Sequence, residues 1–567
     1  MRLQKKYLTI AISALFVSSA MPGMSTAAYA KGYEVIDFGS LPFALSATAN
    51  DMNEQGNFVG VGYNIVDLPI RTELLNPDDF ESIDDLNNLN ATEYLLVRNS
   101  LLARGGKLNQ PEVQKITQYT GLWYNGVLTS INDSLDVIEP ATGLLSRSND
   151  APLYGINNNN EVVGELRAPF VQVNGTDAEG APTIYFVRDR FPQALWSNGV
   201  DHVELSGEDG LTYGGTSRAY AISDNNYVVG FASVEDTERV VSAYATCNDP
   251  ESTSAHLPLD ACMYRAWANS EYEGTQRRPL YNETAYLWEL DATGTVVTQR
   301  SLGLAPTILD ENEGKDEDKQ IIGEERSEAL DVNEQGVAVG FTQFTDGQYT
   351  QNHATIFIDG EANWLIPKGV QGFSQSKAAH INNNGYIAGY ATRVDFQFGR
   401  ERLFIGHTDG REVIFPSGFF SDSSWRPHGI NNYNQVVGRA ERDRTQVQSR
   451  RTVAFKYDIE TDTVTDLNSL LACDAGYDLF DAVSINDNGD IIALANMKDK
   501  RVVDGREYDG LTVRPVLIRA SDTVQACGDR SEKQERKGAA IGPIQLAITF
   551  IFGGVLYITR RRRKVQK

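Results

Sequence analysis

The sequence predicts an all-β protein, a seven-bladed β-propeller of four-stranded antiparallel blades. Three observations lead to this fold class: a hairpin motif occurs seven times, a second strand motif, aromatic in the first six units, follows each hairpin, and one unassigned strand lies at the N-terminal end. At 567 residues the chain exceeds what one ordinary core sustains, so a repetitive architecture is expected. The 49 glycines, in a chain with 41% hydrophobic residues, fit many tight turns between packed strands.

The hairpin motif centres on a polar residue that we call the anchor. The seven anchors are Asn53, Asn157, Ser223, Asn333, Asn382, Asn431 and Asn486. Three positions after each anchor stands a residue that tolerates positive φ, in order Gly56, Asn160, Asn226, Gly336, Gly385, Asn434 and Gly489. Two apolar residues follow, and then glycine in the first six units. A strand is therefore expected to end at the anchor, and a second strand to leave the turn.

A second motif, of the form Ala-x-Leu-Trp, follows each hairpin and predicts a third strand. It is clearest at Trp123, Trp196 and Trp288 and weakest in the last unit. A looser fourth strand follows in the first six units, for example at 413–415, but not in the last. The stretch 33–38 is expected to supply the missing strand and close the ring, which removes free strand edges. An open solenoid is the alternative, although it would need terminal caps.

The spacing of the anchors locates insertions in the first three units. Segment 76–114 contains a helix expected at 91–103, with Leu95, Leu96 and Leu102 available for docking. Segment 310–319 is a charged loop, and 247–262 is a loop tied by a disulfide. Insertions of this kind lie on the faces of propellers, where recognition is expected. Small residues four positions before the anchors, such as Ala378, indicate that the first strand of each blade lies innermost.

The two ends of the chain predict export and anchoring. Residues 1–30 have a basic start, an apolar stretch and a final Ala-Tyr-Ala, which is typical of a signal peptide cleaved before Lys31. The propeller is then expected over 31–528, a polar linker over 529–541, a transmembrane helix over 542–559 and a basic cytoplasmic tail over 560–567. The basic tail places the repeats outside the inner membrane.

Charge and cysteine content narrow the choice of partners and compartment. The formal charge of −25 repels phosphate backbones, so nucleic acid is not expected as a partner. The acidity reflects either solubility or an acidic binding face. Four cysteines in an exported chain predict two disulfides, Cys247 with Cys262 and Cys473 with Cys527. Other pairings, or four free thiols, are the alternatives.

No catalytic residue, cofactor site or metal site is expected. The six histidines lack metal-ligand spacing, and a structural role is favoured for His380 and His428, which lie just before two anchors. Acidic turns beginning at Asp224 and Asp487 suggest calcium, but ordinary turn chemistry explains them more simply. Departures from the repeat at Leu153, Pro427 and Ala493 are apolar, which does not favour a site on the axis.

The pattern Ala-x-x-Ile-Asn-Asn-x-Gly-x-Val-Val-Gly, followed by Ala-x-Leu-Trp-x-x-Gly, resembles the extracellular HAF repeats of bacteria. The whole chain resembles the DUF3466 family of marine gammaproteobacterial proteins. The resemblance implies export and a repeat architecture, without a reaction.

Two functions remain open after these observations. The first is an interaction or scaffold module at the cell envelope, held to the membrane by the C-terminal helix and bound to an unknown envelope protein or polymer. The second is an extracellular hydrolase with its site at the mouth of the central channel. The expected location is the inner membrane facing the periplasm, or the cell surface if a C-terminal sorting signal is processed.

Overall fold

The computed structural model describes residues 31–105, 111–272, 279–305, 326–346, 349–366, 372–395, 398–444, 450–503 and 505–528. The signal peptide expected over 1–30, the charged loop at 310–319, and the linker, transmembrane helix and tail over 529–567 lie outside these ranges. Within the described ranges, no helix has both the length and the hydrophobicity needed to cross a bilayer.

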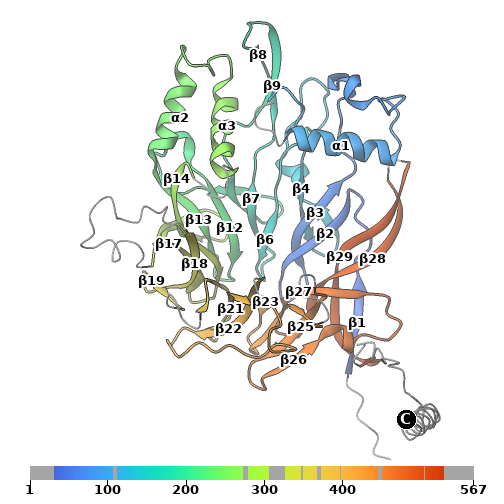
Figure 1. The fold of residues 1–567 in the computed structure, drawn as a ribbon, viewed down its shortest axis with the longest axis vertical. Coiled ribbons are helices and arrows are strands. Elements are labelled where there is room, and N and C mark those ends of the chain that lie inside the picture. Colours follow the sequence, from blue (N-terminus) through green and yellow to red (C-terminus); the bar gives the residue numbers. More distant parts are fainter. Residues whose placement is uncertain are drawn as a thin grey trace, which may run out of the picture. The chain divides into compact units, whose positions relative to one another are not determined.

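Seven antiparallel sheets follow one another along the chain, and we number them as blades 1 to 7 (Figure 1). Blade 1 contains β2 (Ala44–Met52), β3 (Phe58–Ile65), β4 (Tyr119–Tyr124) and β5 (Leu128–Ser130). Blade 2 contains β6 (Leu153–Ile156), β7 (Val162–Leu166), β10 (Gln193–Ser197) and β11 (His202–Leu205). Blade 3 contains β12 (Ser217–Ile222), β13 (Tyr227–Asp236), β14 (Tyr281–Leu290) and β15 (Val296–Gly303).

The remaining blades repeat this order of strands. Blade 4 contains β16 (Ser327–Val332), β17 (Ala338–Asp346), β18 (Tyr349–Ile358) and β19 (Glu361–Trp364). Blade 5 contains β20 (Gln375–Ile381), β21 (Tyr386–Asp395) and β22 (Phe398–His407), and blade 6 contains β23 (Trp425–Ile430), β24 (Gln435–Glu441), β25 (Thr452–Asp458) and β26 (Thr463–Asp466). Blade 7 contains β27 (Asp478–Ile485), β28 (Ile491–Val503), β29 (Arg506–Gln525) and β1 (Lys31–Asp37).

The seven-bladed propeller with four-stranded antiparallel blades is thus confirmed, with one local difference. In blade 5 the fourth strand expected at 413–415 is reduced to a bridge between Ile405 and Ile414.

The N-terminal strand closes the ring, as expected. β1 pairs antiparallel with β29 as the outermost strand of blade 7, and Val35 lies opposite Ile518. The first strands of consecutive blades contact one another around the whole ring, and β27 of blade 7 contacts β2 of blade 1. The first strand is therefore the innermost strand of each blade, and the open solenoid is wrong.

A bulge in the first strand explains two features of the repeat. In every blade the pairing of the first two strands slips by one residue just before the anchor, for example between Ala49 and Asp51. The carbonyl group five positions before the anchor then presses against the glycine of the second strand, so that a Cβ atom on Gly230 would collide with the oxygen of Arg218. The side chain four positions before the anchor is buried; it is alanine in five blades, as at Ala378, and Leu153 and Pro427 in the other two.

The hydrophobic cores lie between neighbouring blades. Trp123 of blade 1 packs with Leu153 and Ile156 of blade 2. Trp196 of blade 2 lies in the same way in a cluster with Ala219 and Ile222 of blade 3. The aromatic residue of the third strand therefore fills the space between two blades, which explains why the Ala-x-Leu-Trp motif recurs.

The long insertions leave the blades between their second and third strands. Blade 1 carries η1 (Thr72–Leu74), η2 (Pro77–Phe80) and α1 (Ala91–Gly105), blade 2 carries the hairpin β8 (Val171–Thr176) and β9 (Pro182–Val187), and blade 3 carries α2 (Glu238–Asn248) and α3 (Leu259–Tyr272). Short 3-10 turns η3 (Asn132–Leu135), η4 (Thr212–Gly214) and η7 (Leu467–Leu470) lie in other connections. The inserted elements and the extended β28–β29 hairpin gather at one end of the blades (Figure 1). We call this end the insertion face and the end that carries the anchors the turn face.

Two of the expected insertions differ in detail. α1 matches the helix expected at 91–103, and Leu95 and Leu102 pack against the core, but Leu96 is 48% exposed. Segment 247–262 includes the end of α2 and the start of α3 rather than only a loop. Disulfides join Cys247 to Cys262 and Cys473 to Cys527. One bond ties α2 to α3, and the other ties the chain after β29 to the segment before β27.

Candidate functional site

The anchor asparagines form a ring of hydrogen bonds on the turn face. Within its own turn, Oδ1 of Asn382 accepts hydrogen bonds from the backbone N–H groups of Asn384 at 3.1 Å and Tyr386 at 2.9 Å. Its Nδ2 donates to the carbonyl oxygen of the next anchor, Asn431, at 2.9 Å. The same link to the next anchor, at 3.0 to 3.4 Å, is made by Asn53, Asn157, Asn333, Asn431 and Asn486. Ser223 has no amide group and interrupts the ring once.

A second ring runs beside the first and is complete. In each blade, the residue after the anchor donates its backbone N–H to the side-chain oxygen of the corresponding residue in the next blade, at 2.7 to 3.0 Å. The members are Glu54, Asn158, Asp224, Glu334, Asn383, Asn432 and Asp487. Burial raises the pKa of Glu54, and the charges of Asp487 and Asp224 raise it further. The residue three positions after the anchor has positive φ in every blade. These residues are Gly56, Asn160, Asn226, Gly336, Gly385, Asn434 and Gly489.

These inter-blade contacts account for the acidic turns that suggested calcium. The Asp487 carboxylate accepts hydrogen bonds from the backbone N–H and Nδ2 of Asn432 at 2.8 and 2.9 Å, and Asp224 accepts from Asn158. Asp490 forms an ion pair with Arg519. In the part of the chain that the structure describes, no three His, Cys, Asp or Glu side chains form a group that could hold a metal ion. These carboxylates hold blades and turns together.

The inner surface of the ring is polar and differs from blade to blade. Arg218 pairs with the buried Glu165 of the preceding blade, and the Tyr220 hydroxyl donates to Glu328 of the next blade at 2.9 Å. Burial raises the pKa of Glu165, but the charges of Arg167 and Arg218 outweigh it and bring the pKa down to about 2. Five positions before the anchors, the seven blades carry Thr48, Pro152, Arg218, Glu328, Lys377, Arg426 and Asp481.

Three residues depart from the repeat with apolar side chains, which did not favour a site on the axis. These residues, Leu153, Pro427 and Ala493, are buried within or between the sheets. The polar variation lies instead two, three and five positions before the anchor, where the bulge directs side chains differently from a regular strand. These polar residues are visible in the sequence, but which of them face the axis can be told only once the bulge is known.

The two histidines near the axis are each held by a carboxylate of a neighbouring blade. Nδ1 of His380 lies 3.7 Å from Oδ2 of Asp331, and Nδ1 of His428 lies 2.8 Å from Oδ1 of Asp481. Asp51 belongs to the same inner surface and accepts three hydrogen bonds, from the backbone N–H groups of Met52 and Ile156 and from the hydroxyl of Ser484. Burial is the largest influence on Asp51 and raises its pKa to about 6.

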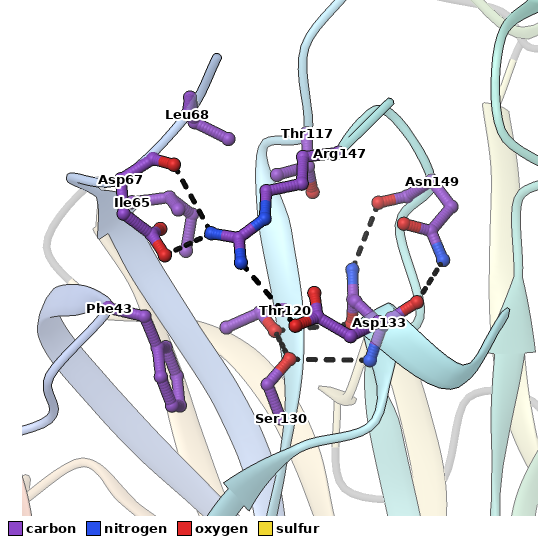
Figure 2. A pocket seen from close by; sticks show the side chains of 11 residues that line it. Phe43, Ile65, Asp67, Leu68, Thr117, Thr120, Ser130, Asp133, Arg147 and Asn149 are labelled. Carbon is purple, nitrogen blue, oxygen red and sulfur yellow. Dashed lines mark hydrogen bonds and ion pairs between the residues drawn. The ribbon is translucent and has the colours of Figure 1, made fainter. Parts of the chain in front are cut away.

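A pocket with a volume of about 80 Å³ opens on the insertion face of blade 1 (Figure 2). It lies where the four strands of the blade reach this face, and the connection from blade 1 to blade 2 completes it. Its apolar wall consists of Phe43, Ile65 and Leu68. Its polar lining consists of Asp67, Thr117, Thr120, Ser130, Asn132, Asp133, Arg147 and Asn149. The sequence did not reveal this pocket, because its residues come from separate connections that share no motif.

Two buried oxygen atoms of the pocket residues lack a hydrogen-bond partner. They are Oδ1 of Asp67 and Oδ1 of Asn149. Arg147 pairs with the other carboxylate oxygen of Asp67 and lies 3.4 Å from Asp133. Asn149 is only 1% exposed, and its Nδ2 donates to the carbonyl oxygen of Asn132 at 2.9 Å, which fixes the direction of its Oδ1. Both oxygens lie within the wall of the pocket, closed to a water-sized molecule.

The search of curated proteins returned no match. Among solved structures, a puromycin-hydrolyzing peptidase of Mycobacterium tuberculosis matches 69% of this chain and 49% of its own, at 11% identity and a TM-score of 0.31. For an acylaminoacyl peptidase of Pyrococcus horikoshii, the match covers 63% of this chain and 52% of the peptidase, at 12% identity and a TM-score of 0.30. For a Trypanosoma rangeli sialidase, it covers 68% of this chain and 57% of the sialidase, at 10% identity and a TM-score of 0.29. The chain thus spans about half the length of these three structures, and scores this low carry no argument about function.

The comparison with protein families covers nearly the whole chain. A family described as a protein of unknown function, DUF3466, matches residues 4–562. The repeats, the closing strand and the insertions described above all lie within the matched residues. This chain therefore belongs to the DUF3466 family.

Proposed function

We propose that the protein is an exported, membrane-anchored interaction or scaffold module of the cell envelope, and that it binds its partner through the insertion face. The observation that carries this proposal is the concentration of irregular, exposed structure on that one face. The signal-peptide pattern of 1–30, the apolar and basic pattern of 542–567, and the resemblance to HAF repeats support the cellular location.

Exposed hydrophobic side chains favour the insertion face as the binding surface. Among the described residues, most of the large ones lie in its connections: Leu96, Val137, Ile138, Leu144, Val171, Val241, Tyr244, Val394, Val502 and Leu511. Leu511 is 71% exposed and Val502 is 66% exposed, both on the long hairpin of blade 7. Exposed apolar side chains gathered on one surface are typical of interaction sites.

Contacts between insertions of different blades hold this face in place. Tyr185 of β9 packs with Leu257 and Ala261 near the start of α3. Arg506, in the hairpin of blade 7, donates to the carbonyl oxygen of Leu89 at 2.8 Å and lies over the ring of Tyr94 in blade 1 at 4.8 Å. A surface that is already ordered loses less conformational entropy when it binds.

A hydrolase with its site at the mouth of the channel is the second candidate. The raised pKa of Asp51 favours it, because a carboxyl group with a pKa near 6 can exchange protons near neutral pH. Against it, Asp51 is engaged by three hydrogen bonds, and Arg218, Glu165 and Asp481 are paired with protein groups. The inner surface is thus organised for contact between blades, and we prefer the interaction module.

Site-specific photo-cross-linking in intact cells that produce the full chain tests this proposal. A photoreactive amino acid replaces Val171, Tyr244 or Leu511 on the insertion face, or Val200 or Tyr433 on the turn face, all of them exposed. We expect specific adducts from the insertion-face positions only. Equal yields from both faces, or no adduct from the insertion face, would contradict the proposal.

Reporter fusions test the proposed orientation. Alkaline phosphatase fused after Asp529 should be active, because the signal peptide exports the propeller, whereas a fusion after Lys567 should be inactive in the cytoplasm. Equal activity of the two fusions would exclude a single membrane span.

A further inference from the structure

Where blades 5 and 6 meet, the inner surface of the ring carries positive charges that the protein only partly neutralises. We propose that Lys377, Arg426 and Arg439 form a binding site for an oxyanion, the carboxylate or sulfate group of a ligand. This inference goes beyond the proposed function, because the site lies on the inner surface and not on the insertion face.

The register of the strands brings these cations together. Arg426 of β23 lies directly opposite Arg439 of β24, and Lys377 of β20 lies directly opposite Tyr390 of β21. The guanidinium of Arg426 reaches across to blade 5 and lies 4.2 Å from the centre of the Tyr390 ring. Directly opposite residues of an antiparallel pair are neighbours on one side of the sheet, so the two arginines stand side by side.

Carboxylates do not balance the charges of this group. Arg426 has an ion pair of 3.3 Å between its Nη1 and Oε1 of Glu401. Among the residues that the structure describes, Lys377 and Arg439 have no hydrogen bond or ion pair. Nζ of Lys377 lies instead 3.9 Å from the centre of the Phe341 ring. Like charges directly opposite each other in adjacent strands are destabilising, and a bound anion would relieve this repulsion.

Charged side chains elsewhere on the inner surface have partners within the protein. Lys377 and Arg426 lie five positions before their anchors. The charged residues at the same position in three other blades are paired, namely Arg218 with Glu165, Glu328 with Arg326 and Asp481 with His428. Blades 5 and 6 are therefore the sector of the described inner surface where positive charge remains available to a ligand.

Arg439 is also exceptional in its exposure. It lies eight positions after its anchor and is exposed. The residue at this position is buried in each of the other six blades, which carry Val61, Glu165, Phe231, Phe341, Tyr390 and Leu494. A ligand can therefore reach Arg439 from solvent, whereas the equivalent side chains are covered by protein.

The three cations suit an oxyanion in their chemistry. A guanidinium presents N–H groups in a planar fork that matches two oxygens of a carboxylate or sulfate, and an ammonium adds a compact charge. Burial and the charge of Arg426 lower the pKa of Lys377, while Glu328 opposes this effect. A nearby anion favours the charged form of a lysine, so an anion bound here would offset both influences.

Titration calorimetry of the purified full chain, at constant ionic strength, tests the proposal with defined probes. The probes are sodium sulfate and sodium glucuronate, with glucose as the neutral comparison. We expect at least one anion to bind saturably and glucose not to bind. Tighter binding of glucuronate would assign the site to a carboxylate, and tighter binding of sulfate to a sulfate group. Absence of saturable binding by both anions would overturn the proposal.

Two matched variants locate the binding. Arg439→Gln removes one cation of the site, whereas Arg300→Gln makes the same change at an exposed arginine on β15, the outermost strand of blade 3. We expect Arg439→Gln to weaken anion binding about tenfold, and Arg300→Gln to leave it unchanged. Equal affinities of these two variants would place the anion elsewhere and overturn the assignment.

A third variant tests the electrostatics in the opposite direction. Glu401→Gln removes the carboxylate that pairs with Arg426, so we expect it to bind the anion more tightly than the original protein does. Unchanged or weaker binding by the folded variant would overturn the proposal. Melting temperatures verify that all three variants fold. Cross-linking from the insertion face does not report on this site, so the proposed function and this inference can each fail alone.

Discussion

The turn face and the insertion face are built from the same seven blades but follow opposite rules. On the turn face, each blade makes the same contacts to the next one through its anchor and the residue after it. On the insertion face, blades 1, 2 and 3 carry different elements, namely a helix with two 3-10 turns, a hairpin and a pair of helices. The comparison teaches that the repeat encodes closure of the ring, whereas the surface that we propose for recognition is built from what is inserted between the repeats.

The largest expected effect comes from breaking the ring on the turn face. Asn382→Ala leaves the N–H groups of Asn384 and Tyr386 without their acceptor and removes one of the two hydrogen bonds to the carbonyl oxygen of Asn431, and should lower the free energy of unfolding by about 3 kcal/mol. The neighbouring Asn383→Ala is its control, because Asn383 is exposed and should cost less than about 1 kcal/mol. Denaturant unfolding measures the free energy of unfolding of both variants. An equal decrease in the two variants would show that the anchor contributes no more to stability than its neighbour.

Overpacking should distinguish the inner strands from the insertion face. Ala378→Phe places a large side chain where Ala378 has no exposed surface, and should cost about 1–3 kcal/mol and lower the melting temperature. Val394→Phe, at an exposed position in the blade 5 hairpin, should change stability by less than about 0.5 kcal/mol. If the two substitutions have similar effects, the first strand is not tightly packed at the centre.

Repair of the ring should stabilise the protein. Ser223 is the one anchor without an amide, and Ser223→Asn supplies the Nδ2 that can donate to the carbonyl oxygen of Asn333. We expect a gain of about 0.5–1.5 kcal/mol in the free energy of unfolding. Ser223→Ala provides the control and should give no gain. A destabilised Ser223→Asn would show that the gap is required by the local geometry.

A dependence of stability on pH is expected at the inner surface. Since burial raises the pKa of Asp51 from 3.8 to about 6, its contribution to stability is fully present below pH 3.8 and is lost as the pH rises through 6. Asp51→Asn cannot ionise, so its melting temperature should rise relative to the original protein between pH 4.5 and pH 7.5. A difference that is independent of pH would mean that the folded protein does not shift the pKa of Asp51.

The repeat made the ring predictable, and the same regularity hid the sites. The spacing of the anchors was sufficient to predict the seven blades and the closure of the ring by β1, because each strand and turn has a recognisable local sequence pattern. The links between Asn382 and Asn431, or between Glu54 and Asp487, could not be inferred, because they join turns of adjacent blades and each residue alone is an ordinary turn residue. The pocket could not be predicted from the sequence either, because Phe43 and Asn149 come together only when the blade is folded.

The central claim is that stability resides in the turn face and recognition in the insertion face. The most direct test measures melting temperature and cross-linking yield, the latter with the photoreactive amino acid at Val171, for Asn382→Ala and for the double substitution Tyr244→Asp with Leu511→Asp. We expect Asn382→Ala to lower the melting temperature and retain cross-linking at temperatures where it is folded. The double substitution should retain the melting temperature and lose the cross-links, because Tyr244 and Leu511 are exposed on the insertion face. If both variants lose both properties in parallel, or if the double substitution leaves cross-linking intact, the division between the two faces is contradicted.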